Sequence, residues 1–268
     1  MEEKVLFLGL LQGVTEFLPV SSSGHLGIAK LTLGVSDPSF SFDLALHLAT
    51  LLAVLIYFLK DIAFLMAEWV CGFFNRNARA WAGWRFGWAV CAGVLVTAPI
   101  GMLLESFAAA SATSLLWLGG SLWMTALLLL SSKFIRAGDG SVRTRDGFFV
   151  GAFQGLAVMP GISRSGSTMW AGLILGLSRD EAFRFSFLLS VPTIIGAALY
   201  EAVKAGGRES FVQSLPEGWI GGAAVAFFSG LISLALLRRI VASDKWWAFS
   251  IYNMIAGSAA AILYFMGG

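Results

Sequence analysis

Six stretches of this chain are continuously apolar over about 20 residues, the length that a helix needs to cross the roughly 30 Å hydrocarbon core of a bilayer. Barrel strands would instead alternate in character over about 10 residues. Charged residues make up only 13% of the chain, whereas an average soluble domain carries about 25%. The sequence therefore predicts an all-α polytopic membrane protein, with transmembrane helices at 42–59, 86–104, 113–132, 183–203, 218–237 and 246–266.

The same composition excludes several other classes of protein. A chain that is 57% hydrophobic is not disordered, and it is too apolar for a coiled coil or an ordinary soluble globule. The formal net charge of +2 is too small to indicate nucleic-acid binding. The two cysteines, Cys71 and Cys91, form no zinc-binding or disulfide pattern. We expect one integral membrane domain that spans residues 1–268, with the bilayer as its surroundings.

Two further apolar segments, 5–35 and 147–178, are each interrupted near the middle. The interruptions read Pro19-Val-Ser-Ser-Ser-Gly-His25 and Pro160-Gly-Ile-Ser-Arg-Ser-Gly166, and such residues break helices. Each half is too short to cross a bilayer, so a helical hairpin that enters and leaves on one face is favoured. Because irregular backbone survives at membrane depth only where protein or water satisfies it, these two re-entrant hairpins are candidate functional sites.

The two broken segments repeat each other in sequence. A shift of 142 residues aligns them without a gap, and twelve of the thirty positions from Phe7 to Ser36 are identical. Three predicted spans separate the hairpins, provided that 62–74 is an interfacial helix. An odd number of crossings inverts the second copy, which predicts an inverted-topology repeat of approximately 5–132 and 147–266.

Basic residues predict the orientation of this repeat. They gather in the loops of one face, which the positive-inside rule makes cytoplasmic. Both termini then lie outside, and the two hairpins enter from opposite faces so that their tips can meet within the bilayer. The residues concerned are Lys60, Arg76, Arg79, Arg85, Lys133, Arg136, Arg143, Arg145, Arg238, Arg239 and Lys245.

Ionisable side chains inside the predicted hairpins indicate a function, because charge at membrane depth is costly. The first hairpin holds Glu16 and His25, and the second holds Arg164. Arginine offers a planar donor fork for phosphate oxygens, and Ser-Gly turns that open helices present free N–H groups to an anion. The accompanying polar residues are Gln12, Ser21, Ser22, Ser23, Ser163, Ser165 and Thr168.

The residues alone leave several roles open. Glu16 could hold a divalent cation or act as a base, and His25 could activate the hydroxyl of Ser22, three residues before it. Serine-rich breaks are also common packing devices, so Ser22 by itself indicates little. His47 lies four residues after Asp43, and the two could form either a structural pair or a support for the site.

Two motifs resemble the signatures of the undecaprenyl-diphosphate phosphatase family of bacitracin-resistance proteins. They are Gln12-Gly-Val-Thr-Glu-Phe-Leu-Pro-Val-Ser-Ser-Ser-Gly-His25 and Pro160-Gly-Ile-Ser-Arg-Ser-Gly-Ser-Thr168. The resemblance implies six spans, two re-entrant hairpins and hydrolysis of undecaprenyl diphosphate to the monophosphate and inorganic phosphate. It also implies a Mg²⁺ or Ca²⁺ requirement, a role in cell-wall synthesis and bacitracin resistance, and a bacterial cytoplasmic-membrane location with the site open to the outer side.

The resemblance also implies roles for individual residues. Glu16 is the catalytic and metal-binding acid, Arg164 clamps the diphosphate, and Ser22 or His25 attacks phosphorus, with His25 otherwise activating Ser22. Gln12 stands at a position where the family also has glutamate. Because an amide supplies no charge, metal binding would rest on Glu16 alone, and Gln12 would orient water or phosphate. The remaining expected phosphate-binding residues are Ser21, Ser23, Ser163, Ser165 and Thr168. A flippase for polyprenyl phosphate is the alternative function, because inverted repeats with broken helices are a transport architecture. We also expect a polyprenyl diphosphate lipid as the partner and a homodimer as a possible assembly.

Overall fold

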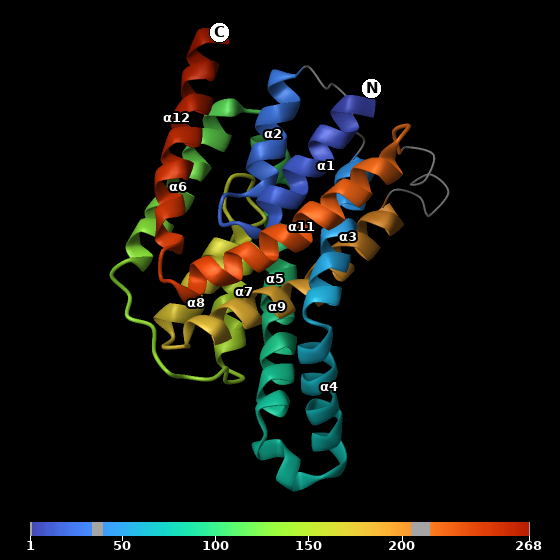
Figure 1. The fold of residues 1–268 in the computed structure, drawn as a ribbon, viewed down its shortest axis with the longest axis vertical. Helices are drawn as coiled ribbons and strands as arrows, with labels where there is room; N and C mark the ends of the chain where they lie inside the picture. Colours follow the sequence, from blue (N-terminus) through green and yellow to red (C-terminus); the bar gives the residue numbers. More distant parts are fainter. Residues whose placement is uncertain (1, 34–39, 205–214, 268) are drawn as a thin grey trace.

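A computed structural model describes residues 2–33, 40–204 and 215–267, and its regular elements in these ranges are all helices (Figure 1). One isolated bridge between Gly140 and Leu177 is the sole extended pairing in the described part. The all-helical fold that the sequence predicts is therefore confirmed.

Both predicted interruptions are present as turns between short helices. The first hairpin consists of α1 (Glu2–Phe17) and α2 (Ser22–Thr32), and the second consists of α7 (Asp146–Leu156) and α8 (Arg164–Ile174). A serine caps the helix that follows each turn. Ser21 Oγ accepts the N–H of Gly24, and Ser163 Oγ accepts the N–H of Gly166. The same local chemistry thus starts the second helix of each hairpin.

Five helices are long and apolar enough to cross a membrane, and a bent pair of helices would make a sixth crossing within the described residues. Five of the six expected spans overlap these long helices, and the sixth, 42–59, overlaps the first helix of the bent pair. A multi-pass membrane protein is therefore confirmed. The five are α5 (Ala82–Ser111), α6 (Leu115–Ser132), α9 (Arg179–Lys204), α11 (Trp219–Ala242) and α12 (Phe249–Gly267), the last preceded by the short η2 (Trp246–Ala248).

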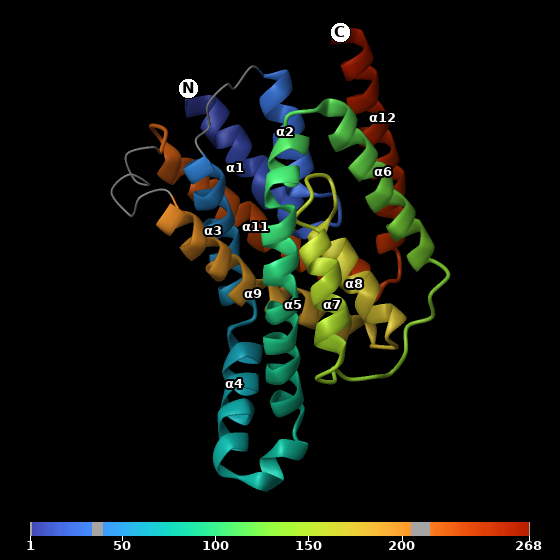
Figure 2. The same cartoon turned by 180° about the vertical axis from the view of Figure 1, so that it is seen from behind.

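The bent pair consists of α3 (Phe40–Tyr57) and α4 (Leu59–Phe74), which meet at an angle of 74°. The expected interfacial helix at 62–74 is therefore a separate helix, and its depth in a membrane stays a prediction. It packs against the first half of α5, where the Glu68 carboxylate accepts the N–H of Gly83 at 2.7 Å. Together with η1 (Arg76–Ala80), α4 and the start of α5 project beyond the rest of the bundle (Figures 1 and 2).

Paired glycines allow the first helix of each hairpin to pack closely on a long helix. A Cβ at Gly9 of α1 would lie 2.2 Å from the carbonyl oxygen of Gly222 in α11. A Cβ at Gly151 of α7 would lie 2.5 Å from the carbonyl oxygen of Gly93 in α5. Gly9 and Gly151 are also equivalent under the 142-residue shift. Each hairpin thus packs on a helix from the opposite half of the chain.

The turns of the two hairpins meet in the interior and are held there by α6 and α12. Gly24 lies so close to the second turn that a Cβ on it would be 2.9 Å from the Cα of Gly161. Thr125 of α6 donates to the Gly161 carbonyl at 2.8 Å, and Asn253 of α12 donates to the Pro19 carbonyl at 3.0 Å. These buried bonds satisfy irregular backbone that has no helical partner of its own.

Candidate active site

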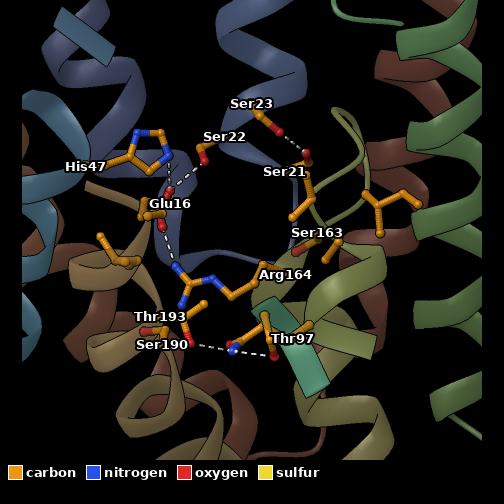
Figure 3. A pocket seen from close by; sticks show the side chains of 16 residues that line it. Glu16, Ser21, Ser22, Ser23, His47, Thr97, Ser163, Arg164, Ser190 and Thr193 are labelled. Carbon is orange, nitrogen blue, oxygen red and sulfur yellow. Dashed lines mark hydrogen bonds and ion pairs between the residues drawn. The ribbon is translucent and has the colours of Figure 1, made fainter. Parts of the chain in front are cut away.

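A cavity of about 230 Å³ lies where the two hairpin turns meet (Figure 3). A single water needs only about 10–15 Å³ of such space, so the cavity can hold a larger polar group. Its wall is built from both hairpins together with α3, α5 and α9. The polar residues that line it are Glu16, Ser21, Ser22, Ser23, His47, Thr97, Gln154, Ser163, Arg164, Ser190 and Thr193.

Glu16 is the centre of the hydrogen bonds around this cavity. Its Oε2 accepts the Ser22 hydroxyl at 2.6 Å and the Gln12 amide at 3.0 Å, while its Oε1 pairs with Nη2 of Arg164. Nε2 of His47 lies 3.7 Å from the same carboxylate. The Glu16 side chain is only 5% exposed, so its charge depends on these partners for stabilisation.

Arg164 brings the second hairpin to Glu16 of the first. It is the first residue of α8, directly after the capping Ser163, and this position directs its guanidinium into the cavity. Its Nη1 is buried and has no hydrogen-bond partner among the described residues. One half of the guanidinium fork is thus occupied by Glu16, and the other half can bind an anion.

Two helix N-termini converge on the cavity. Ser21 and Ser163, the caps of α2 and α8, both line it, and each lies 3.3 Å from a second serine hydroxyl, that of Ser23 and of Ser165 respectively. Helix N-termini carry a partial positive charge and free N–H groups. Together with Arg164 they make this side of the cavity suitable for a phosphate or diphosphate group.

The structure does not bring His25 to Ser22, contrary to the expected nucleophile–base pair. His25 is absent from the cavity lining, and its Nδ1 lies 2.8 Å from the Ser21 carbonyl oxygen. Its Nε2 lies 2.8 Å from the hydroxyl of Tyr252, on which the imidazole is stacked. Side chains in the first turn of a helix lean toward its N-terminus, which directs His25 back onto the carbonyl four residues earlier. The hydroxyl of Ser22 is bonded to Glu16 instead.

Three other expected residues support the site without lining the cavity. Gln12 lies behind Glu16, Ser165 is bonded to Ser163, and the Thr168 hydroxyl lies 2.5 Å from that of Ser186 on α9. Thr168 therefore joins α8 to α9, whereas the sequence predicts that it binds phosphate.

The sequence reasoning missed several residues of the cavity wall. Of the two roles expected for His47, the structure favours support of the site, because the Asp43 side chain pairs with Lys30 and the His47 ring faces Glu16. Thr97, Ser190 and Thr193 come from spans in which single polar residues gave little signal. Gln154 could have been found, because it is the counterpart of Gln12 in the repeat.

The acidic residues give limited support for a metal site. The described residues contain no group of three or more His, Cys, Asp or Glu side chains arranged to hold a metal ion. Gln12, however, leaves its buried Oε1 without a partner in that part of the chain. A carboxylate is a ligand that Mg²⁺ and Ca²⁺ accept, so Glu16 fits a cation that takes its remaining ligands from phosphate and water, whereas Gln12 lies outside the cavity lining.

Comparison with known proteins identifies the family. Residues 5–259 match the model of the family described as Bacitracin resistance protein BacA. Relatives named undecaprenyl-diphosphatase include one from Trichlorobacter lovleyi, 38% identical over 97% of this chain and 96% of its own length. Another, from Myxococcus xanthus, is 36% identical over 97% of this chain and 88% of its own length. This chain therefore belongs to the bacitracin resistance protein BacA family.

Proposed function

We propose that this chain hydrolyses undecaprenyl diphosphate to undecaprenyl phosphate and inorganic phosphate. The observation that carries the proposal is the buried contact of Glu16 with both Ser22 and Arg164, in a membrane protein whose relatives are named for this reaction. The product is the carrier lipid for cell-wall synthesis. Removal of the diphosphate, which bacitracin sequesters, gives resistance to that antibiotic.

Ser22 is the nucleophile in the proposed mechanism. Its proton passes to Glu16 as Oγ forms a bond to the terminal phosphorus, and the bond from that phosphorus to the bridging oxygen breaks. Glu16 then passes the proton to the departing polyprenyl phosphate. Arg164 and the N-termini of α2 and α8 stabilise the charge that develops on the phosphoryl oxygens.

Water completes the reaction on the phosphoserine. Its oxygen forms a bond to phosphorus while the bond from phosphorus to Ser22 Oγ breaks. One water proton returns through Glu16 to Oγ, and the other remains on the released phosphate. This sequence restores both Ser22 and Glu16.

His25 is a positioning residue in this proposal, not the base. The Ser21 carbonyl only accepts, so Nδ1 carries a proton, and in the neutral ring Nε2 accepts from the Tyr252 hydroxyl. Both nitrogens are then engaged away from Ser22. Ser21 has a backbone φ of 66°, which is unfavourable for a residue with a side chain, and the bond from His25 stabilises this conformation.

A divalent cation, Mg²⁺ or Ca²⁺, also belongs to the proposal, as a second positive charge beside Arg164. Glu16 would hold it, and the Gln12 amide would orient water or phosphate. When bound, it would neutralise charge on the diphosphate oxygens.

The finer architecture is also proposed: six spans and two re-entrant hairpins in an inverted repeat of approximately 5–132 and 147–266. The reciprocal glycine packing of α1 on α11 and of α7 on α5 supports it. The start of α1 and the end of α12 lie at one end of the molecule, opposite the basic η1 (Figure 1). The positive-inside rule then supports a cytoplasmic η1 and, in a bacterial cytoplasmic membrane, a site that serves the outer side. A homodimer stays a prediction.

The name of the relatives and the bond from Ser22 to Glu16 favour hydrolysis over the flippase alternative, because transport does not need an activated hydroxyl. The test is phosphate release from undecaprenyl diphosphate by the purified protein in detergent, with Mg²⁺ or with a chelator. We expect Ser22→Ala and Glu16→Gln to abolish release, while Ser243→Ala, at an exposed position at the end of α11, keeps it. Full turnover by Ser22→Ala would contradict the mechanism.

A further inference from the structure

The cavity wall opposite His47 and Ser22 carries a strip of uncharged polar groups among apolar side chains. Figure 3 shows Thr97, Ser190 and Thr193 on one side of Arg164, with His47 and Ser22 on the other. Gln154 joins this wall through its amide nitrogen, which lies 3.3 Å from the Thr97 hydroxyl oxygen and 2.9 Å from that of Thr193. Three separate helices, α5, α7 and α9, thus contribute to one polar strip.

The hydroxyl protons of this strip are already used. Thr97 donates to the Gly151 carbonyl at 2.9 Å, and Thr193 donates to the Leu189 carbonyl at 2.8 Å. Each threonine can therefore only accept from Gln154, which fixes the amide with its nitrogen toward the threonines.

Gln154, which lines the cavity, consequently has a free acceptor and no free donor. Its Nε2 has two protons and two threonine partners, so both are engaged. Its Oε1 is buried and has no partner among the described residues. A buried acceptor without a partner is unfavourable, and a bound group that donates a hydrogen bond would remove this cost.

The two sides of the cavity therefore differ in hydrogen-bonding character. The Arg164 side offers donors, including the unpartnered Nη1, while the Gln154 side offers an acceptor. Because Nη1 and the Gln154 Oε1 both lack partners, they do not bond to each other. A ligand with acceptor oxygens and one O–H group would satisfy both.

We propose that Gln154, held by Thr97 and Thr193, forms a subsite for an O–H donor beside the phosphate-binding groups. This inference rests on the proposed function. The donor is either the protonated oxygen of inorganic phosphate or a water molecule. Sulfate, a similar anion that carries no proton at neutral pH, cannot donate to Gln154, so the cavity should distinguish it from phosphate.

The test compares phosphate with sulfate as ligands of the purified protein at pH 8, where both are mainly dianions. Thermal unfolding of the protein in detergent at increasing anion concentration gives an apparent Kd for each, without any turnover. We expect the wild type to bind phosphate roughly tenfold or more tightly than sulfate. Gln154→Met keeps the side-chain length but removes the acceptor, and should bring this ratio close to one.

Two further variants separate the subsite from general damage. Thr193→Val removes one partner of the amide and should lower the ratio in part. Thr50→Val is the matched control, because Thr50 is the repeat counterpart of Thr193 and its hydroxyl donates to backbone carbonyls of its own helix. It should leave the ratio unchanged. If Gln154→Met does not fold, Thr193→Val supplies the comparison with the wild type.

The two sources of the O–H group give different results. A lost preference in Gln154→Met identifies the phosphate oxygen. An unchanged preference with kcat for lipid diphosphate lowered about tenfold identifies a water molecule. Unchanged preference and unchanged kcat would overturn the subsite. Failure of the proposed function would appear separately, as absence of lipid diphosphate hydrolysis by the wild type.

Discussion

A comparison of His25→Asn with His25→Ala distinguishes a positioning role for His25 from a role as the catalytic base. In asparagine the side-chain Nδ2 can occupy the place of the imidazole Nδ1, which donates to the Ser21 carbonyl. Alanine cannot make this bond. If His25 stabilises the backbone that carries Ser22, asparagine should preserve activity. If His25 accepts a proton during catalysis, asparagine and alanine should be equally inactive.

The magnitude follows from the contacts that alanine removes. A buried hydrogen bond contributes about 0.5–1.5 kcal/mol, and an unfavourable φ such as that of Ser21 stores about 1–3 kcal/mol that its surroundings must offset. Relaxation of Ser21 would draw the Ser22 hydroxyl away from Glu16. With about 1.4 kcal/mol for each factor of ten, we expect kcat/KM to fall roughly 10- to 100-fold in His25→Ala. For His25→Asn we expect a decrease of about threefold or less.

The assay is phosphate release from undecaprenyl diphosphate between pH 5.5 and 8.5, with kcat and KM measured separately. Tyr252→Phe, which removes only the hydroxyl next to Nε2 of His25, should lower kcat/KM roughly twofold to fivefold. His25→Gln serves as the matched control, because its amide reaches the position of Nε2 but not that of Nδ1. The reasoning would be refuted if His25→Asn were as inactive as His25→Ala. Loss of the acidic limb of the pH profile in His25→Asn would refute it equally.

Three other changes test the remaining parts of the site and fold. Arg164→Lys keeps the charge but not the planar fork, so we expect kcat to fall about 100-fold or more, measured by the same assay in a protein that still elutes as a folded species. Gln12→Glu should be tolerated and should tighten Mg²⁺ binding, measured by activity and by the metal dependence of thermal unfolding; an inactive variant would mean that the amide itself is required. Gly151→Leu places a Cβ about 2.5 Å from the Gly93 carbonyl oxygen and should prevent α7 from packing on α5, seen as loss of folded protein in detergent, whereas Gly120→Leu, where a Cβ meets nothing within 4 Å, should fold normally.

The local chemistry of the sequence was sufficient to predict the helices, the two broken hairpins and the identity of the central acid and arginine. Hydrophobic length, Pro–Gly breaks and capping serines act within a few residues, so they can be read without knowledge of the rest of the fold. The repeat likewise follows from sequence, because it relates residues by position alone. Glu16 and Arg164 were recognised because charge at membrane depth is costly wherever it lies.

The tertiary structure alone decided which of these side chains meet. Glu16 and Arg164 are 148 residues apart, and their contact depends on the packing of both hairpins against helices of the opposite halves. The partner of Ser22 was predicted from a three-residue spacing, but the direction of side chains in the first turn of α2 turned His25 toward Ser21 and left Glu16 next to the hydroxyl. His47, Thr97 and Thr193 became part of the cavity only because α3, α5 and α9 surround it. Spacing along one helix specifies a face, whereas the contents of a cavity depend on which faces from distant segments are packed together.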